Sequence, residues 1–297
     1  MLRLLALCLA YMATLVPAQA QDALEPGGLV VIGWPQEVPQ TLGDQVVEFL
    51  TATPTAPVEP KKAEPEQPRD PRPMLAIVID DYGPNMQVAS EIFALGEGIQ
   101  HFTHALMPGY RATGPIAQVL QNRGLCHIVH LPMQAIVDKE GSKEYLIGLD
   151  TPSSKIDALV RDLRARFPAA WGVNNHRGSK ATADPRVMTD FMTVMSKLGW
   201  NFLDSRTSSK SVAVAKAKEL GVTALTNTGF IDGKTNTAYH KEQFQRALQR
   251  AKRKGSAIVI CHARSTTLPF LRWVVNNPPK DVRLVTLEEL ASATTKE

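Results

Sequence analysis

The sequence predicts a parallel β/α barrel, and three observations support this fold class. Eight short apolar segments typical of strands alternate along residues 74–297 with segments of helical periodicity. The first strand segment, residues 75–79, is an unbroken run of five apolar residues, as expected for a parallel sheet covered on both faces. The glycine-rich loop of dinucleotide-binding open sheets is missing from the sequence. Together these features favour a barrel over an open sheet.

The predicted strands and helices follow one another in a regular order. Turn residues such as Pro108, Gly124 and Gly199 separate them. Strands are expected at residues 75–79, 99–107, 125–131, 169–173, 200–203, 222–225, 257–261 and 282–285. Helices are expected at residues 85–95, 114–122, 184–198, 210–220, 237–254 and 268–275, with one more after Ser153 and Ser154, which we expect to cap it, and a last one from Leu287.

Residues 1–20 have the pattern of a secretory signal peptide. Arg3 gives a charged start, residues 4–16 form a short apolar stretch, and Ala18-Gln19-Ala20 is a small-x-small cleavage site. We therefore expect export to the periplasm or cell envelope, with no membrane span left after cleavage, because the apolar stretch is short for a bilayer. Lipid attachment at Cys8 is disfavoured, since little hydrophobic sequence precedes it. An uncleaved anchor is the alternative.

Three regions follow the signal peptide. Residues 21–50 are sparse in charge and receive no assignment. Residues 51–73 contain seven prolines mixed with Ala, Glu, Lys and Thr. We expect them to form an extended linker, because proline lacks a backbone donor and the apolar content is too low for a core. Residues 74–297 are long enough for one large domain with a substantial core.

Charge and cysteine content limit the partners. The net charge of +4 falls to +3 when residues 1–20, with their one Arg, are removed. This weak excess gives no reason to expect a nucleic-acid partner, and the basic residues 250–254 are interpreted as a solvated helix end. Cys126 and Cys261 lie in apolar segments, which favours buried free thiols over a disulfide, although an oxidising compartment leaves the disulfide open.

Two adjacent carboxylates, Asp80 and Asp81, end the first strand. In parallel α/β folds ligands bind beyond the carboxyl ends of the strands. Successive strand residues point to opposite sides, so we expect the two carboxylates to have different roles. One can hold a metal while the other accepts a proton. The structural alternative is that Asp81 caps the next helix and Asp80 pairs with a buried base.

Other predicted strands also end in polar side chains. A closed barrel brings these ends to one face, where they supply Asp80, Asp81, His130, Asn175, His176, Asp204 and His262. One acidic oxygen and two imidazoles make an open site for Zn²⁺ or a similar cation. A further carboxylate beside it can act as a base, and a distant His as an acid.

These motifs resemble the divergent polysaccharide deacetylase family, a branch of the NodB-type carbohydrate esterases. The resemblance rests on Ile-Asp-Asp at 79–81, His-Leu-Pro-Met at 130–133, Asn-Asn-His-Arg-Gly-Ser at 174–179, Leu-Asp-Ser at 203–205 and His262. It extends from Met74 to about Leu290. It implies a distorted barrel of seven to eight parallel strands and an exported metal-dependent deacetylase that removes N-acetyl groups from an envelope polysaccharide such as peptidoglycan.

The resemblance also implies roles for single residues. Asp80 corresponds to the base that activates water, and His262 to the acid that protonates the leaving amine. Asp81 and His130 correspond to ligands of a divalent metal, most simply Zn²⁺. His176 is the candidate for the remaining imidazole, because His130 lacks a second His at the parent family's spacing; His127 is the alternative, on the opposite face of its strand.

The remaining site residues are expected to support this chemistry. Asn175, Ser179 and Asp204 would position substrate or metal ligands. The parent family's arginine that orients the base has no clear counterpart, and Arg206 and Arg264 are the candidates to replace it. His262 is followed by Ala263, where the divergent relatives usually have proline. Two other hypotheses stay open: a glycan- or protein-binding barrel without catalysis, and a metal-dependent hydrolase for another bond.

Overall fold

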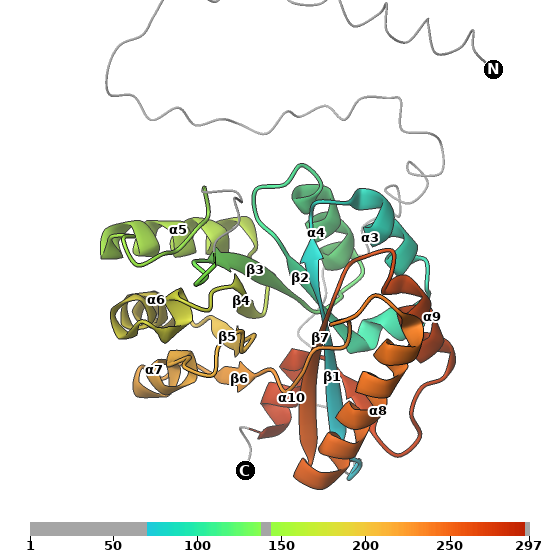
Figure 1. Ribbon diagram of the computed structural model, residues 1–297. Helices are drawn as coiled ribbons and strands as arrows, with labels where there is room; N and C mark the ends of the chain where they lie inside the picture. Colours follow the sequence, from blue (N-terminus) through green and yellow to red (C-terminus); the bar gives the residue numbers. More distant parts are fainter. Residues whose placement is uncertain (1–69, 138–143, 295–297) are drawn as a thin grey trace, which may run out of the picture. The chain divides into compact units, whose positions relative to one another are not determined.

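The protein is described by a computed structural model for residues 70–137 and 144–294, in which eight parallel strands alternate with helices (Figure 1). The strands are β1 (Met74–Tyr82), β2 (Phe102–Leu106), β3 (His127–Met133), β4 (Gly172–Arg177), β5 (Asn201–Asp204), β6 (Ala224–Thr226), β7 (Ser256–His262) and β8 (Arg283–Val285). The fold class predicted from the sequence is confirmed, with all eight strands in the expected order.

The sheet runs in the order β6-β5-β4-β3-β2-β1-β7, and β8 also pairs with β1. On one edge, β1 pairs with β8 over Met74–Ala76 and then with β2 from Ile77 onward. On the other edge it pairs with β7 along Met74–Asp80. β8 and β2 therefore pair with successive parts of the same edge of β1, and β8 does not continue the sheet beyond β7. This arrangement distorts the barrel.

An extended connection links the two ends of the sheet, β6 and β7. After β6 the chain pairs with β7. The backbone N–H of Thr228 donates to the carbonyl of Ile258 at 2.8 Å, and the N–H of Ile260 donates to the carbonyl of Gly229 at 3.0 Å. Ile231 N–H then donates to the carbonyl of Ile260. Residues 228–231 thus take the place of a ladder between β6 and β7, where a regular barrel would close by direct strand pairing.

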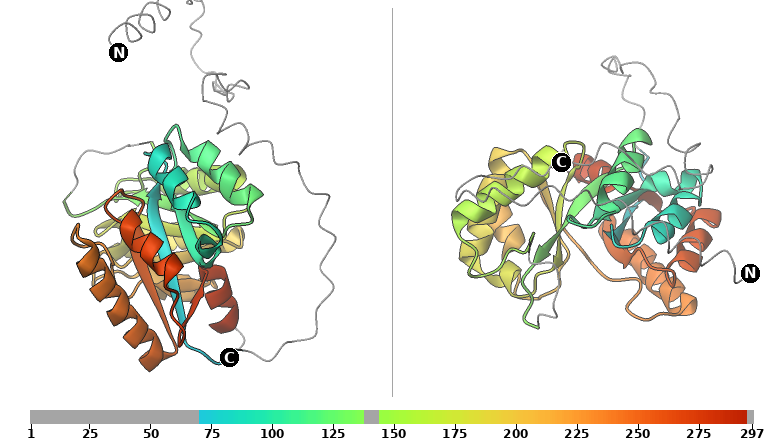
Figure 2. Two further views of the ribbon diagram at one scale, coloured as in Figure 1. Left: turned by 90° about the vertical axis from the view of Figure 1, so that its right-hand side faces the viewer. Right: turned by 90° about the horizontal axis from the view of Figure 1, so that it is seen from above.

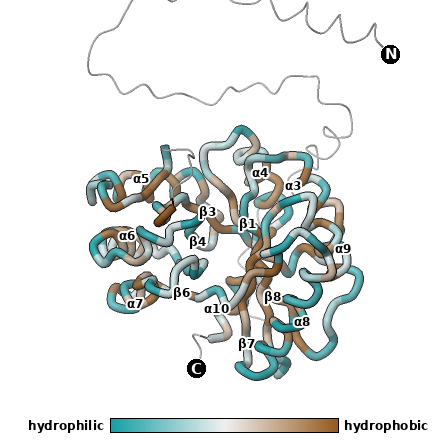
Figure 3. Tube along the Cα trace, in the orientation of Figure 1, coloured by the Kyte–Doolittle hydropathy of each residue, from teal (hydrophilic) through white to brown (hydrophobic). Residues whose placement is uncertain are grey.

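The strands contribute to two apolar layers. Leu75, Ile77 and Ile79 of β1 pack in the larger cluster together with residues of the helices, whereas Ala76 and Val78 pack with inward residues of other strands. Strand side chains alternate between the two sides of a sheet, so one side of each strand faces the helices and the other the barrel interior. Apolar residues are concentrated along the central strands, and hydrophilic ones on the outer sides of the helices (Figure 3).

The helices are α3 (Met86–Phe93), α4 (Thr113–Asn122), α5 (Ser153–Arg166), α6 (Pro185–Lys197), α7 (Ala213–Glu219), α8 (Thr237–Lys254), α9 (Leu268–Asn276) and α10 (Leu287–Thr294), with short 3₁₀ helices at Glu97–His101 and Ala181–Ala183. Helices α3 to α9 cover the outside of the sheet, whereas α10 packs Leu287 and Leu290 against the inward-facing residues of the strands. Helices α5, α6 and α7 lie in a row on one side of the molecule, and α3, α8 and α9 on the other (Figure 2).

Three local predictions differ from the structure. The second strand begins at Phe102, because residues 97–101 form a 3₁₀ helix in which Gly98 lies so close to Val275 that a Cβ would clash at 2.6 Å. The fourth strand begins at Gly172 and continues through the polar residues to Arg177. Ser153 does not cap its helix; its hydroxyl donates to Asp190 of α6 at 2.7 Å.

Other features agree with the sequence. Cys126 and Cys261 are free thiols. The basic residues of the last turn of α8 are exposed, and Lys252 pairs with Asp281 at 3.0 Å. The expected signal peptide, the unassigned residues 21–50 and most of the proline-rich linker lie outside the described residues. Within residues 70–137 and 144–294, no helix is both long and apolar enough to cross a membrane.

Helix α8 provides a test of local stability. The side chain of Asn236 caps it by accepting the backbone N–H of Tyr239 at 2.8 Å. We expect Asn236→Ala to lower the free energy of unfolding by about 1 kcal/mol, because one helix-end donor loses its partner. The exposed Gln249 in the same helix is the matched control, and Gln249→Ala is expected to change stability by less than about 0.5 kcal/mol. Equal losses in urea titrations of both variants would contradict the capping role.

Candidate active site

Inward-facing side chains meet at the carboxyl ends of the strands. Every second residue along a strand points into the barrel interior, so these residues share one parity, odd or even, in their numbers. Examples are Ala76 and Val78 in β1 and Ile258 and Ile260 in β7. Continuing that parity to the strand ends places the following polar residues at the mouth of the barrel: Asp80, His130, Asn174, His176, Ser205 and His262. Four of them were predicted as site residues from the sequence, namely Asp80, His130, His176 and His262.

Asp81 reaches the same place by a break in the strand. Its φ of 67° is left-handed, and the register between β1 and β2 shifts between Ile79 and Tyr82. The sequence-based expectation that Asp80 and Asp81 point to opposite sides is wrong, because this irregularity turns Asp81 back toward the mouth. Both carboxylates approach Nε2 of His130, Asp80 at 3.6 Å and Asp81 at 3.4 Å. The cap of the next helix is Asn85, not Asp81.

Asp81, His130 and His176 form a cluster whose potential ligand atoms all lie within 4.8 Å of one another. Nδ1 of His176 lies 3.2 Å from Oδ1 of Asp81 and 3.0 Å from Nε2 of His130. Oδ1 of Asp81 is buried and makes no hydrogen bond among the described residues. Burial opposes ionisation of Asp81, but the two imidazoles outweigh it and hold the pKa of this carboxyl far below its usual range.

Asn174 defines which nitrogen of His130 faces this cluster. The amide nitrogen of Asn174 donates to Oδ1 of Asp80 at 2.9 Å and lies 3.2 Å from Oγ of Ser205, so its carbonyl oxygen is the acceptor toward Nδ1 of His130 at 2.8 Å. Nδ1 of His130 is therefore the donor, and in the neutral ring Nε2 carries a lone pair toward Asp81. A second group commonly fixes a metal-binding imidazole in this way. Asn174 was not predicted from the sequence.

The cluster fits a divalent cation of the zinc class. Two imidazole nitrogens and one carboxylate oxygen are a common donor set for such an ion in sites that keep a position open. Without a positive charge between them, the lone pairs of Nε2 and Oδ1 face each other at 3.4 Å. His130 responds to this environment: burial would lower its pKa, but Asp80 and Asp81 raise it above the usual value. A proton or a cation would relieve the same repulsion.

His262 lies at the end of β7 and is held by Asp232. Nδ1 of His262 is 2.9 Å from Oδ1 of Asp232, and the backbone N–H of His262 donates to Oδ2 at 2.9 Å. The hydroxyl of Thr267 donates to the same carboxylate at 3.2 Å. Burial would lower the pKa of His262, but the Asp232 carboxylate raises it above the usual value. Asp232 lies in the connection between β6 and β7, outside the strand ends from which candidates were chosen.

Asp80 lies between His130 of the possible cation site and His262. It is the register partner of His262 across β1 and β7, and its carbonyl accepts the N–H of Ala263 at 2.8 Å. Its side chain is buried and held by the amide of Asn174. Burial raises the pKa of Asp80, although His130 and His262 act in the opposite direction. A buried carboxyl with a raised pKa is a candidate for proton transfer.

Three predicted supporting residues hold loops instead of touching this cluster. Asn175 accepts the backbone N–H of Ser205 and donates to the carbonyl of Arg177. Asp204 accepts the hydroxyl of Ser211 at 2.7 Å and the backbone N–H of Arg206. Ser179 accepts the backbone N–H of Ile136 at 3.0 Å. Asn175 and Asp204 have the opposite parity to the inward residues of β4 and β5, which explains their outward direction.

The other candidates are resolved by position. His127 starts β3 and bonds to the carbonyl of Leu125, so it lies at the opposite end of the strand from His130. The guanidinium of Arg264 lies 3.4 Å from Oδ2 of Asp81, so it contacts the metal-ligand candidate and not Asp80. In the described contacts the group that holds Asp80 is Asn174.

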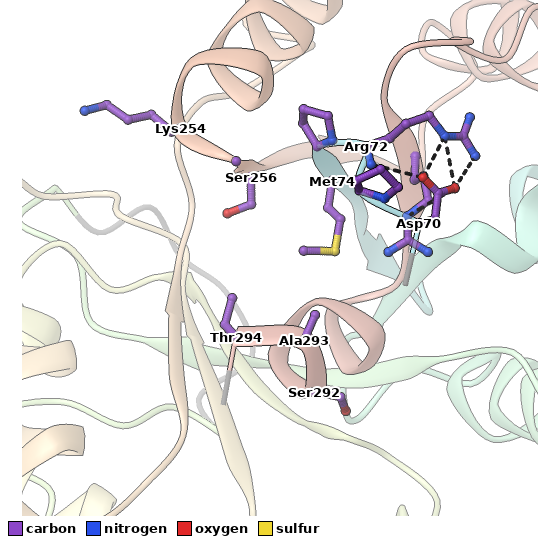
Figure 4. A pocket seen from close by; sticks show the side chains of 12 residues that line it. Asp70, Arg72, Met74, Lys254, Ser256, Ser292, Ala293 and Thr294 are labelled. Carbon is purple, nitrogen blue, oxygen red and sulfur yellow. Dashed lines mark hydrogen bonds and ion pairs between the residues drawn. The ribbon is translucent and has the colours of Figure 1, made fainter. Parts of the chain in front are cut away.

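A cavity of about 580 Å³ lies at the opposite end of the barrel (Figure 4). It is lined by the starts of β1, β7 and β8, including Met74, Ser256 and Arg283, and by the end of α10. Asp70 and Arg72 form an ion pair at its edge, at 2.6 Å. Barrel enzymes carry out chemistry at the carboxyl ends of the strands, so this cavity is not the candidate active site.

Comparison with known proteins gives a family. A family model described as divergent polysaccharide deacetylase matches residues 77–291. An uncharacterized protein of Haemophilus influenzae is 36% identical over 219 residues, which cover 73% of this chain and 76% of that protein. The uncharacterized protein YibQ of Escherichia coli K12 is 32% identical over 216 residues, covering 73% of this chain and 66% of YibQ.

Solved structures share the fold. An uncharacterized protein from Agrobacterium tumefaciens C58 superimposes with a TM-score of 0.66 at 17% identity, covering 76% of this chain and 92% of that one. A protein from Enterococcus faecalis V583, with a proposed role in cellobiose-phosphate cleavage, gives a TM-score of 0.55 at 12% identity over 74% of this chain and 99% of that one. At these identities the likeness concerns the fold.

The pairing of His262 with Asp232 can be measured directly. We expect Asp232→Asn to lower the pKa of His262, because the imidazolium loses the carboxylate that stabilises it while its burial is unchanged. An NMR titration of the ring resonances measures this pKa. Asp281→Asn, an exposed carboxylate paired with Lys252, is the control and should leave it unchanged. The same His262 pKa in both variants would show that Asp232 is not the cause of the shift.

Proposed function

This chain belongs to the divergent polysaccharide deacetylase family, and from this premise we propose that it is a metal-dependent deacetylase acting on the N-acetyl groups of a glycan. One observation carries the proposal. Asp81, His130 and His176 converge within 4.8 Å beside the buried Asp80, and Asp80 is the strand neighbour of His262. Cation ligands, a proton acceptor and a proton donor are thus gathered at one barrel mouth.

The cation would be held by Oδ1 of Asp81, Nε2 of His130 and Nδ1 of His176. When bound, such an ion supplies Lewis-acid polarisation of an amide carbonyl and makes water more acidic. The donor set favours Zn²⁺ or a similar ion. Asn174 would keep the ring of His130 in the tautomer that leaves Nε2 free.

The remaining chemistry belongs to two side chains. The carboxylate of Asp80, held by Asn174, would accept a proton from the attacking water, and its raised pKa makes it a stronger base than an exposed carboxylate. His262, kept protonated by Asp232, would donate a proton to the nitrogen of the departing amine. Acetate and the free amino sugar are the products.

The substrate and the location extend the proposal. The family name points to a polysaccharide, and residues 1–20 have the pattern of a signal peptide, so we propose an exported protein that acts on an envelope glycan such as peptidoglycan. The orienting arginine expected beside Asp80 is replaced by the neutral Asn174, whose amide cannot supply the same positive charge. A barrel that binds glycan or a protein without hydrolysis is therefore the alternative function.

Metal binding is the first test. We expect the purified protein to bind about one Zn²⁺ per chain, and His130→Ala and His176→Ala each to weaken binding by at least about 10- to 100-fold, the range seen when outer-shell partners are lost. Competition with a chromophoric chelator measures the affinity. His101→Ala is the control, because His101 precedes β2 at the other end of the barrel. Unchanged affinity in both site variants would exclude this cluster as the metal site.

Acetate release is the second test. We expect the wild-type protein to release acetate from N-acetylated glycan fragments, and Asp80→Asn to lower kcat/KM by about 10²- to 10⁴-fold, the usual contribution of a positioned base. Bound metal, measured in the same samples, should be retained. Asp281→Asn makes the same substitution at an exposed position and should have full activity. If the metal-loaded wild type releases no acetate from chitin, peptidoglycan or other fragments, the non-catalytic alternative is favoured.

A further inference from the structure

The loops after four of the strands carry exposed charge of one sign. The exposed ionisable residues in the loops after β4, β5, β6 and β7 (residues 178–184, 205–212, 227–236 and 263–267) are Lys180, Arg206, Lys210, Lys234 and Arg264. The whole chain has a net charge of only +4, so these four neighbouring loops differ from the average surface. Clefts lined by charge of one sign concentrate ligands of the opposite sign.

The acidic residues at the ends of the same strands do not balance these cations. Asp204 is buried and bonded to Ser211, and Asp232 is bonded to His262. Asp184 caps α6 by accepting the N–H of Val187 at 2.8 Å. A hydrogen bond does not remove the charge of a carboxylate, but only Asp184 and Asp232 lie within the four loops, so their five cations remain in excess by three. The charge that the four loops offer to a ligand is positive.

Arg264 connects this charge to the candidate active site. Its backbone N–H donates to the carbonyl of His262, and its own carbonyl accepts the N–H groups of Thr267 and Leu268 at the start of α9. Its side chain is 53% exposed and touches Oδ2 of Asp81 at a single 3.4 Å contact. A guanidinium has five donors, so this contact leaves Arg264 able to bind a carboxylate from solution.

Arg206 is held at the end of β5. It has a left-handed φ of 57°, which costs a non-glycine residue about 1–2 kcal/mol. The loop compensates through defined bonds: the backbone N–H of Arg206 donates to Asp204, and the hydroxyl of Thr207 donates to the carbonyl of Arg177 at 2.7 Å. The exposed side chain of Arg206 therefore starts from a fixed backbone. Binding a ligand therefore requires ordering of the side chain but not of the loop backbone.

Exposed apolar side chains also follow three of the strands. Phe230 is 37% exposed and its ring is parallel to that of His262, with 6.3 Å between the ring centres. Tyr110 and Met86, in the segments after β2 and β1, are also exposed. A sugar ring has an apolar C–H face as well as polar groups at its edge. A mouth with both an exposed aromatic ring and guanidinium groups suits a sugar that carries an anionic group.

We propose that this site selects acidic glycans, that is, N-acetylated saccharides bearing carboxylates, and that Arg206 and Arg264 bind those carboxylates. The inference rests on the proposed function, because it assumes that the glycan reaches the Asp81 cluster. It adds the substrate class and the two residues that recognise it. Neutral polymers of N-acetylated sugar lack the group that these arginines attract.

Binding of a matched pair of glycans tests the proposal. One sample is an N-acetylated glycan fragment with free carboxylates, and the other is the same fragment with its carboxylates converted to amides. Calorimetry on the full-length Asp80→Asn protein, loaded with Zn²⁺, measures affinity while substrate turnover is suppressed. We expect the acidic fragment to bind several-fold more tightly at low salt, and the difference to shrink at high salt, since exposed charges are screened.

Variants locate the effect. Arg206→Gln and Arg264→Gln are each expected to weaken binding of the acidic fragment about two- to five-fold, the range for one exposed charge pair, with little change for the amidated fragment. The double variant Arg253→Gln/Lys254→Gln is the control, because it removes two exposed cations from the other end of the barrel. Zn²⁺ affinity is measured for Arg264→Gln, so that an indirect effect through Asp81 is recognised.

The outcomes separate this inference from the proposed function. Equal affinity for the two fragments, or an equal loss in the control variant, would overturn the selection of acidic glycans even if acetate is released. Tighter binding of polyglutamate than of the acidic fragment would also overturn it, because the site would then respond to charge alone. If the acidic fragment binds selectively but the wild type releases no acetate, the preference for acidic glycans is supported and the proposed deacetylase activity is rejected.

Discussion

The alternation of side chains along parallel strands is the constraint on which the candidate site depends. In β1, β3, β4 and β7 the parity that fills the barrel with Ala76, Ile128 or Ile258 also places the polar residues of the strand ends at one mouth. Asp81 would be excluded by this rule. A left-handed backbone and a register shift return it to the mouth, which supplies the third atom of the possible cation site. Strain of this kind is typical of functional positions.

Asn174 links the candidate base, Asp80, to the candidate metal ligand His130. Its side chain bonds to Nδ1 of His130 and to Asp80, and it is completely buried. Removing one partner of such a bond leaves a buried polar group unsatisfied, at a cost of about 1–3 kcal/mol. The orientation of the candidate base and the tautomer of the candidate ligand therefore depend on one amide. A charged side chain at this position would disturb both, so the neutral amide suits a site that already holds two carboxylates.

Sequence patterns predicted the strand order and the inward residues Asp80, His130, His176 and His262, because strand ends are recognisable and must converge in a barrel. They did not separate Asn174 from Asn175, because the predicted strand ended at residue 173 and left both residues in a loop, whereas β4 continues to Arg177. The turn at Asp81 follows from a backbone angle that no residue pattern specifies. Asp232 was missed because it belongs to a connection with no predicted secondary structure.

The distortion of the barrel explains why that connection carries Asp232. Residues 228–231 pair with β7 where a regular barrel would have a β6–β7 ladder, and Ile231 is buried within this segment. Phe230 and Asp232, on either side of Ile231, both contact His262, one by its ring and the other by its carboxylate. A short β6 followed by an extended segment thus places a buried acid against a strand-end imidazole. The irregular part of the barrel is what equips His262 to hold a proton.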